Sequence, residues 1–159
     1  MIRKATREDF DFIYELYMHQ QINPFLLYEQ MDAESFLPIY NDLLVKEVLY
    51  VFEDDGLSTG MCKLVPQQYR NAHIIYLGGF AIHPFFGGRG EGLKMMLEII
   101  AYVKAKGFLR IELSVASINE KAIRLYEKAG FVKEGLLKRF TYLKSENKYL
   151  DEVMMAYLF

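Results

Sequence analysis

A glycine-rich turn between a predicted strand and a predicted helix constrains this chain more than any other feature. The turn reads Gly87-Gly88-Arg89-Gly90-Glu91-Gly92, after an apolar run at 73–82 and before an apolar stretch from Leu93 to Lys106. The first N–H groups of a helix lack intrahelical partners, and the helix dipole favours negative charge at that end. A strand, a glycine turn and a helix in succession therefore predict an anion-binding site.

Two familiar nucleotide loops do not fit these letters. A P-loop needs Lys and then Ser or Thr directly after its last glycine, but Leu93 follows Gly92. The dinucleotide fingerprint would need glycine where Leu93 or Met95 stands. The turn is therefore neither loop, and taken alone it is equally compatible with a flexible, helix-capped connection.

The pattern along the chain predicts an α/β fold whose central sheet is mixed, largely antiparallel and flanked by helices. Helical spacing or strand-like runs alternate with turn signals such as Asp54-Asp55-Gly56 and Ser145-Glu146-Asn147-Lys148. The predicted strands are 1–5, 48–52, 59–65, 73–82, 109–115 and two segments after 131, and the predicted helices are 10–17, 33–45, 93–106 and 119–129.

Two local expectations accompany these helices. Thr6 and Asp9 form a variant of a capping box before the first helix, and Asp9, Asp11 and Glu15 are expected to face water. Pro38 lies in the second helical stretch, where proline fits only an early turn.

Bulk composition excludes several classes of protein. The 159 residues with 52% apolar content suit one domain, 1–159, and a net charge of −2 with interleaved signs argues against nucleic acid as a partner. Cys62 is the one cysteine and is expected in the core, while His19 and His73 have no companions at metal spacing, so we expect no metal. Without an apolar leader at Met1 or a run that spans a bilayer, we expect a cytoplasmic protein with no membrane partner.

A second motif lies downstream of the glycine turn. The segment 119–131 reads Asn119-Glu120-Lys121-Ala122-Ile123-Arg124-Leu125-Tyr126-Glu127-Lys128-Ala129-Gly130-Phe131. Together the two motifs resemble the GNAT superfamily of N-acetyltransferases, whose signature is Q/R-x-x-G-x-G/A after a strand and then Asn-x-x-Ala-x-x-x-Tyr-x-x-x-Gly-Phe. The second pattern is matched at every letter, and the element order agrees over nearly the whole chain.

The resemblance implies acetyl-CoA as the acyl donor and assigns its contacts. The strand before the turn would bind the pantetheine arm through its backbone, the loop amides would bind the pyrophosphate, and a later asparagine would contact the pantetheine. These roles fall on Phe80, Ala81 and Ile82, on Gly88, Arg89, Gly90, Glu91, Gly92 and Leu93, and on Asn119.

The turn departs from the family pattern at two positions. Gly87 stands where the family has Gln or Arg, so one side-chain contact to the pyrophosphate is missing and Arg89 is a candidate replacement. Glu91 stands where an apolar residue is usual, and we expect its carboxylate to point to solvent, away from the phosphates.

The same resemblance implies a catalytic role for Tyr126 as the acid that protonates the leaving thiolate, and it leaves the base open. Some family members carry a Glu where this chain has Ser114. Glu112 lies on the same strand face and is the candidate base through a water, with an ion-paired strand carboxylate as the equal alternative. His83 is a further candidate, although a turn histidine before Pro84 is the commoner explanation.

The acceptor is expected between the first two helices and the last hairpin. The segments 19–28 and 141–142 are aromatic and nearly uncharged, which suits a primary amine of a small molecule or of a protein terminus. The acidic residues Glu29, Asp32 and Glu34 would attract a cation or simply cover a helix surface. A non-catalytic acyl-CoA-binding module is the alternative function, and a homodimer through the aromatic last strands is the expected assembly.

Overall fold

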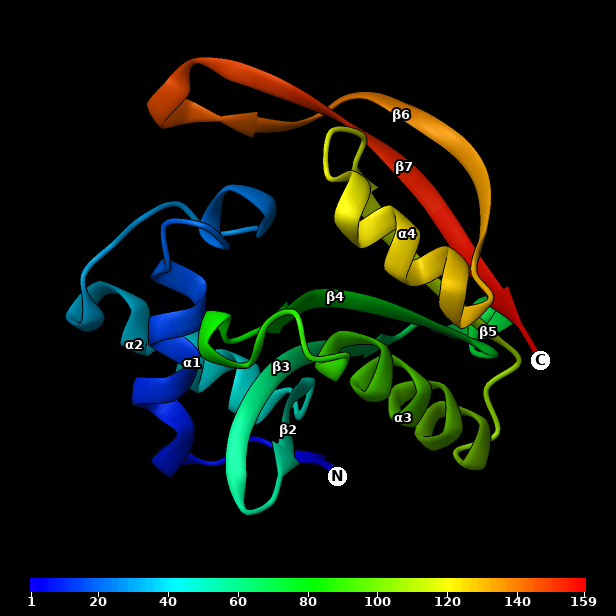
Figure 1. Ribbon diagram of the computed structural model, residues 1–159, viewed down its shortest axis with the longest axis horizontal. Coiled ribbons are helices and arrows are strands. Elements are labelled where there is room, and N and C mark those ends of the chain that lie inside the picture. Colours follow the sequence, from blue (N-terminus) through cyan, green and yellow to red (C-terminus); the bar gives the residue numbers. More distant parts are fainter.

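The computed structural model describes residues 1–159 as one sheet with helices on both faces (Figure 1). Short 3-10 turns join some of the elements. The helices are α1 (Phe10–Met18), α2 (Ala33–Val45), α3 (Glu91–Ala105) and α4 (Glu120–Ala129), and the strands are β1 (Ile2–Lys4), β2 (Leu49–Asp54), β3 (Leu57–Pro66), β4 (Ile74–Ile82), β5 (Arg110–Ala116), β6 (Val132–Leu143) and β7 (Lys148–Leu158).

The seven strands form one sheet in the order β1-β2-β3-β4-β5-β7-β6. Every neighbouring pair is antiparallel except β4 and β5, which confirms the predicted mixed, largely antiparallel sheet. The parallel ladder joins only Ile74–Tyr76 to Arg110–Glu112, although β4 continues to Ile82 and β5 to Ala116. The two strands therefore separate at their carboxyl ends, where backbone groups on the facing edges are left unpaired.

A bulge in β4 reverses the faces of its side chains. The register with β3 shifts between Met61 and Lys63, and Gly79 has φ +56°, which favours glycine. Before the bulge, Ile75 and Leu77 pack with α3, and after it Phe80 and Ile82 do. The bulge thus places Phe80 on the α3 face, where strict alternation from Leu77 would place Gly79.

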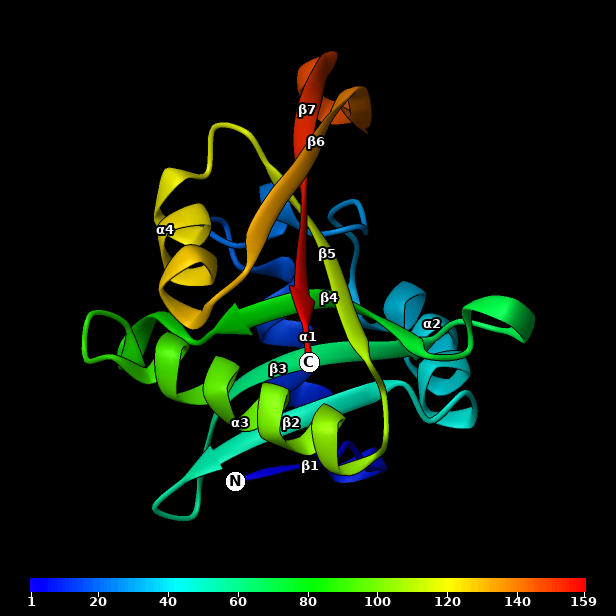
Figure 2. The same ribbon diagram turned by 90° about the vertical axis from the view of Figure 1, so that its right-hand side faces the viewer.

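Two hydrophobic clusters lie on opposite faces of the sheet. One joins the strands to α3 and α4 and contains Met95, Ile99 and Phe131. The other joins them to α1 and α2 and contains Tyr17, Phe36 and other aromatic side chains. The view in Figure 2 shows the β6–β7 hairpin extending well beyond these layers. Cys62 is a free, buried cysteine of the first cluster, as the sequence predicts.

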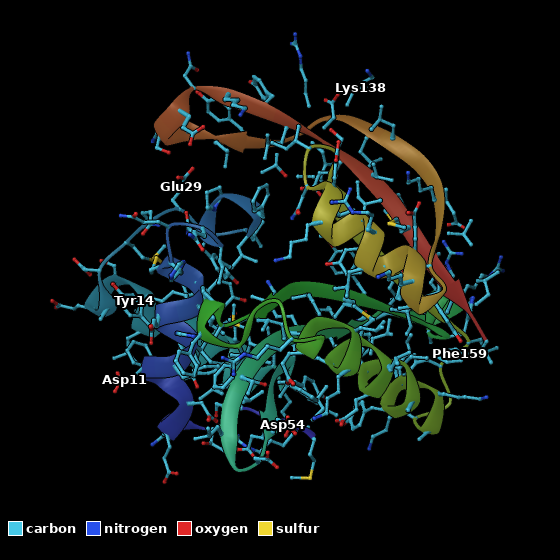
Figure 3. The ribbon with its side chains drawn as sticks, in the orientation of Figure 1. Asp11, Tyr14, Glu29, Asp54, Lys138 and Phe159 are labelled. Carbon is cyan, nitrogen blue, oxygen red and sulfur yellow. The ribbon has the colours of Figure 1, made fainter.

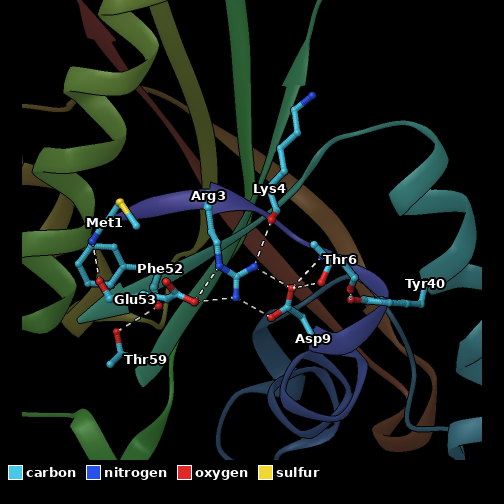
Figure 4. Close-up of polar contacts among 9 residues, drawn as sticks. All are labelled: Met1, Arg3, Lys4, Thr6, Asp9, Tyr40, Phe52, Glu53 and Thr59. Atoms are coloured by element: carbon cyan, nitrogen blue, oxygen red, sulfur yellow. Dashed lines mark hydrogen bonds and ion pairs between the residues drawn. The ribbon is translucent and has the colours of Figure 1, made fainter. Parts of the chain in front are cut away.

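The predicted capping box forms, but the expectation that Asp9 faces water is wrong. The Asp9 carboxylate is 7% exposed and accepts hydrogen bonds from both terminal nitrogens of Arg3 at 2.8 Å and from the Thr6 N–H at 2.8 Å (Figure 4). Arg3 also donates to Glu53 at 2.7 Å. Asp9 is buried because this network compensates the carboxylate for the loss of water and ties the start of α1 to β1 and β2.

Pro38 also differs from expectation, since it lies inside α2 and not in an early turn. It cannot donate to the carbonyl of Glu34 four residues earlier, and Glu34 lies in the exposed first turn. Water can satisfy that carbonyl, so the helix tolerates the proline. The remaining boundaries agree closely with expectation, and Asp55 and Gly56, with φ +48° and +74°, form the tight β2–β3 turn.

No helix in this structure is long and apolar enough to cross a membrane.

Candidate active site

The glycine turn presents a row of unpaired backbone donors. None of the N–H groups from Gly88 to Leu93 donates a hydrogen bond within the protein, and the first donor of the helix is Lys94, to the carbonyl of Gly90 at 3.0 Å. Gly88 and Gly90 have φ of +75° and +80°, and no atom lies within 4 Å of the position of a Cβ on either. The turn therefore aims free N–H groups into open space at the positive end of α3, as an anion site requires.

Glu91 does not point to solvent, contrary to expectation. Its Oε2 atom is shielded from water and has no hydrogen-bond partner. Glu91 is the first residue of α3, where the helix dipole stabilises a negative charge. The carboxylate therefore lies against the protein at the helix start, and this orphaned oxygen is a strained feature of the turn.

Gly87 contributes no side chain to the turn, and Arg89 is the one cation within it. The N–H of Gly87 donates to the carbonyl of Pro84 at 3.0 Å, so this residue closes the preceding 3-10 turn. The Arg89 guanidinium lies over the Phe85 ring, 5.8 Å from its centroid. This cation–π contact holds the arginine beside the free amides.

The second motif builds and orients α4. The Asn119 Oδ1 accepts from the Ala122 N–H at 3.2 Å as the N-cap, while the Asn119 side-chain NH₂ has no partner in the protein. Gly130, with φ +104°, ends the helix, and Phe131 enters the core beside Tyr126. Most residues of this motif therefore have structural roles, and two polar groups, the Asn119 amide and the Tyr126 hydroxyl, remain free to contact a ligand.

Tyr126 projects from α4 towards the region where β4 and β5 separate. Its side chain is 7% exposed and packs edge-on against Phe80 with centroids 5.9 Å apart. Burial, with smaller contributions from Tyr76 and Glu152, raises the pKa of Tyr126 well above its ordinary value. The phenol is consequently protonated at neutral pH, as a proton donor must be.

The predicted pantetheine strand lies directly beside this tyrosine. Ala81 pairs with Met61 and Ile82 with Gly60 on the β3 side, so their opposite backbone edge faces the separation from β5. The structure thus brings the strand segment Phe80–Ile82, the glycine turn and Tyr126 together, since Phe80 contacts Tyr126 and the Cβ position of Gly92 lies within 4 Å of Ile82 and Leu125. Figure 1 shows the elements that carry them, β4, α3 and α4.

Glu112 and His83 are held by other groups. The Glu112 carboxylate accepts from Arg110 at 2.9 Å and from Gln67 at 3.1 Å, one bond to each oxygen. The His83 Nε2 contacts Glu15 at 3.0 Å, and its Nδ1 accepts from the Phe85 N–H at 3.2 Å. This geometry favours the ion-paired and turn-capping alternatives for the two residues.

Sequence inspection missed Tyr76 and Glu152 at the separation of β4 and β5, and it named Ser114 only as the position where some family members carry a Glu. The Tyr76 hydroxyl and the Ser114 Oγ lie 3.1 Å apart and bridge the two strands. Glu152, on β7, pairs across from Ala116, and its charge acts on the pKa of Tyr126. The Thr141 hydroxyl donates to Glu152 Oε1 at 2.9 Å, which leaves Oε2 without a protein donor. No motif marks these residues, because only the sheet order brings β7 beside β5.

A pocket lies where the acceptor site is expected. The loop after α1 forms one wall and the tip of the β6–β7 hairpin forms the other, as Figure 3 shows for Glu29 below the hairpin. The Lys144 N–H donates to Glu29 Oε1 at 3.2 Å and joins the two walls. Asn23, 9% exposed, donates to the carbonyls of Tyr17 and Tyr28 and fixes the loop. The lining residues are Asn23, Pro24, Leu26, Leu27, Tyr28, Glu29, Thr141, Tyr142, Leu143, Ser145 and Glu146.

Comparison with solved structures gives close matches over the whole chain. Spermidine N-acetyltransferase from Vibrio cholerae, in complex with CoA and spermine, superposes with a TM-score of 0.87 at 24% identity, over 99% of this chain and 94% of that one. Ribosomal-protein-alanine N-acetyltransferase from Brucella melitensis gives 0.81 at 20% identity, over 100% and 99%. A putative acetyltransferase from Salmonella typhimurium with its cofactor acetyl-CoA gives 0.78 at 21%, over 99% and 92%. At these identities the likeness establishes the shared fold.

Sequence comparison identifies the family. An SPbeta prophage-derived uncharacterized N-acetyltransferase, YokL, of Bacillus subtilis strain 168 is 28% identical over 93 residues, which are 58% of this chain and 51% of that protein. The matched part thus spans about half the length of that relative. The profile of the Acetyltransferase (GNAT) family matches residues 10–131, which include both motifs and most of the sheet. The chain therefore belongs to the GNAT family of acetyltransferases.

Proposed function

We propose that residues 1–159 form one domain that transfers the acetyl group of acetyl-CoA directly to a primary amine. The observation that carries this proposal is the buried Tyr126 phenol, which is protonated at neutral pH, at the end of the sheet that also bears the unpaired N–H groups Gly88–Leu93. Solved relatives with CoA or acetyl-CoA support the choice of donor.

Donor binding uses groups that the protein leaves unpaired. The Gly88–Leu93 amides and Arg89 would hold the pyrophosphate, and the backbone of Phe80–Ile82 with the Asn119 amide would hold the pantetheine. Since these groups have no competing partner within the chain, no internal hydrogen bond has to break when the donor binds.

The chemistry follows from the position of Tyr126. The neutral amine nitrogen attacks the thioester carbonyl carbon, the new N–C bond forms as the C–S bond breaks, and the thiolate takes the phenolic proton of Tyr126. The nitrogen then releases its surplus proton to solvent, and solvent returns a proton to the Tyr126 phenolate, so that the products are the amide and the free thiol. Phe80 packs against the Tyr126 ring and holds the hydroxyl towards the sulfur. The shielded environment that raises the pKa of Tyr126 also keeps its proton available at neutral pH.

For the base, the structure supports Glu152 better than the predicted Glu112. Both Glu112 oxygens are engaged, whereas Glu152 keeps Oε2 free and its charge reaches Tyr126. We propose that Glu152 holds the incoming ammonium group and accepts its proton through a water, so that the neutral amine attacks.

The acceptor is a primary amine of a small molecule or of a protein terminus. The solved relatives include proteins named for spermidine and for ribosomal-protein alanine, which are both amine acceptors. The pocket between the loop after α1 and the hairpin is lined by Tyr28 and Tyr142, whose rings would pack against such a group.

The test measures CoA thiol release with acetyl-CoA and a panel of primary amines. Tyr126→Phe removes the proton donor with little change in packing, and we expect kcat to fall by about a hundredfold or more. Tyr102→Phe is the matched control, since that hydroxyl contacts only Tyr50 at 3.4 Å on the α3 side, and it should leave kcat unchanged. Tight acetyl-CoA binding without thiol release from any amine would instead establish the non-catalytic binding module.

We also propose that the protein forms a homodimer through the outer edge of β6. This edge strand is exposed over its length and carries Val132, Leu136 and Phe140, which are 65%, 49% and 57% exposed. Sedimentation velocity should show a dimer that Phe140→Lys dissociates, and a monomer at all concentrations would contradict the proposal.

A further inference from the structure

A half-buried lysine without a counter-ion faces the same side of the sheet as the acceptor pocket. Lys63, on β3, makes no ion pair and no hydrogen bond, and the one attractive contact of its ammonium group is with the Tyr28 ring, 5.1 Å from the centroid. Buried ammonium groups in proteins are normally paired, because loss of water is costly. The proposed acyl transfer, as described above, gives this residue no role.

Lys63 lies against the β4 bulge, next to the proposed thioester. It pairs with Gly78, and its Cε lies 3.7 Å from the position of a Cβ on Gly78 and 3.5 Å from one on Gly79. Phe80, the next residue, contacts Tyr126 from the opposite face. The absence of side chains at Gly78 and Gly79 leaves room for the Lys63 stem close to the reaction centre.

The groups around Lys63 are aromatic rather than acidic. The same two glycine positions contact the Tyr76 ring and the Tyr17 hydroxyl, and Tyr17 is fully buried without a hydrogen-bond partner. Tyr28 shares its ring with the acceptor pocket. Burial lowers the pKa of Lys63 below its ordinary value, and no carboxylate raises it again.

The carboxylates of this region have other partners, and none of them pairs with Lys63. Glu112 is bound by Arg110 and Gln67, Glu152 by Thr141, and Glu29 by the backbone of the hairpin. The positive charge therefore has no internal partner, while Glu152 supplies a negative charge on β7. A zwitterion has the complementary pair of charges.

We propose that Lys63 binds a carboxylate of the acceptor, so that the acceptor is an amine that also carries a carboxyl group, as a free amino acid does. This inference rests on the proposed acyl transfer, with the ammonium group of the acceptor at Glu152 and its carboxylate at Lys63. It also predicts that a polyamine is a poor acceptor, because a second ammonium group would meet the Lys63 charge.

The first experiment compares matched acceptors in steady-state kinetics. Amino acids such as L-leucine and L-phenylalanine are each paired with the amine that lacks the carboxyl group, 3-methylbutylamine and 2-phenylethylamine. In Lys63→Met, which keeps the length of the stem, we expect KM for the amino acids to rise by about tenfold to a hundredfold and KM for the carboxyl-free amines to change by less than about twofold. Lys63→Arg, which keeps the charge, should restore most of the affinity.

Two controls accompany the kinetics. The melting temperature and the acetyl-CoA dissociation constant of Lys63→Met should match the wild type, since Lys63 contacts neither the glycine turn nor α4. Spermidine turnover should rise in Lys63→Met, because the repelling charge is removed. An equal loss of kcat with both members of each pair would overturn the proposal and make Lys63 a general base or a structural residue.

The second experiment needs neither turnover nor a variant. In wild-type protein with ¹³C-labelled lysine and bound CoA, NMR follows the titration of Lys63 with each acceptor. The pKa of Lys63 should rise with an amino acid and stay unchanged with the carboxyl-free amine, because only a bound carboxylate stabilises the charged form. No response to any amino acid overturns the proposal. A response without thiol release would preserve the carboxylate site and refute acyl transfer, so the two failures are distinguishable.

Discussion

The proposed donor side and the proposed acceptor side of this site are built in different ways. The donor side uses mainly backbone N–H groups of one short stretch, Gly88–Leu93, and two side chains from one helix motif. The acceptor side uses side chains that come from β3, β7, the loop after α1 and the hairpin. Backbone groups can bind the same donor whatever side chains surround them, whereas a side-chain wall can change its substrate with single substitutions.

The largest effect on kcat should come from Glu152, compared with the second strand carboxylate, Glu112. Glu152→Gln is expected to lower kcat by about a hundredfold, because the acceptor amine loses both its anchor and its proton acceptor. Glu112→Gln is the matched control and should lower kcat only a few-fold, since Arg110 and Gln67 already occupy that carboxylate. The pH dependence of kcat/KM, measured for both variants, checks the assignment, and the reverse ranking would return Glu112 to the role of base.

A smaller effect, on the free energy of unfolding, is expected from two ion pairs, one that anchors α1 and one that anchors α3. Arg3 ties Asp9 at the start of α1, on the acceptor side, to β1, and its loss leaves a nearly buried carboxylate, so Arg3→Ala should lower the free energy of unfolding by about 2 kcal/mol. Lys94 ties α3, on the donor side, to Asp54 in an exposed pair, and Lys94→Ala should lower the free energy of unfolding far less than Arg3→Ala does. Urea unfolding of both variants measures the difference, and equal losses would contradict it.

Arg89 tests how much a side chain adds to the backbone amides in donor binding. Arg89→Ala should raise the acetyl-CoA dissociation constant by about tenfold, because one charged contact is lost while the backbone amides remain. The KM for the amine should not change. Calorimetry with acetyl-CoA checks this, and Lys106→Ala, at the far end of α3, is the control. An unchanged dissociation constant would show that Arg89 does not replace the missing side chain at Gly87.

The smallest expected effect is on the stability of the protein at low pH. Burial would raise the pKa of Asp9, but hydrogen bonds from Arg3 and Thr6 outweigh it and hold that pKa below its ordinary 3.8. The stabilisation is therefore present above pH 3.8 and is lost as the pH falls through the lower folded-state pKa. Melting temperatures measured from pH 5 downward should fall less steeply in Asp9→Asn than in the wild type. Parallel curves for the two proteins would show that this carboxylate does not control acid stability.

Local signals predicted most of the fold because each element carries its own boundary. The Asp55-Gly56 turn, the Asn119 cap and the Gly130 stop each act within a few residues, so the letters alone locate them. The expectations that Asp9 faces water and that Pro38 lies in an early turn were wrong because they used local sequence alone. Arg3 lies only six residues before Asp9, but it reaches that carboxylate because β1 runs beside the start of α1, and Pro38 is tolerated because the carbonyl it leaves unpaired lies in an exposed turn.

The site residues likewise fall into those that a local motif predicts and those that only the structure locates. The positions Gly88–Leu93, Asn119 and Tyr126 were predicted from contiguous motifs, and the structure packs the glycine turn against α4, which carries Tyr126 and is capped by Asn119, although their roles stay proposals. Glu152 and Lys63 carry no motif. Sheet order places β7 between β5 and β6, and the Gly79 bulge lets Lys63 lie beside the point where β4 and β5 separate.

The sequence by itself determined the order of the elements, the free amides of the glycine turn and the family, since these depend on spacing within short segments. Only the tertiary structure decided which charged side chains are paired within the protein and which are not. Glu91 turns against the protein, Glu112 is bound by its neighbours, and Lys63 stands without a counter-ion. The physical reason is that a side chain's partner is set by strand register and helix packing over long sequence separations, which no local pattern encodes.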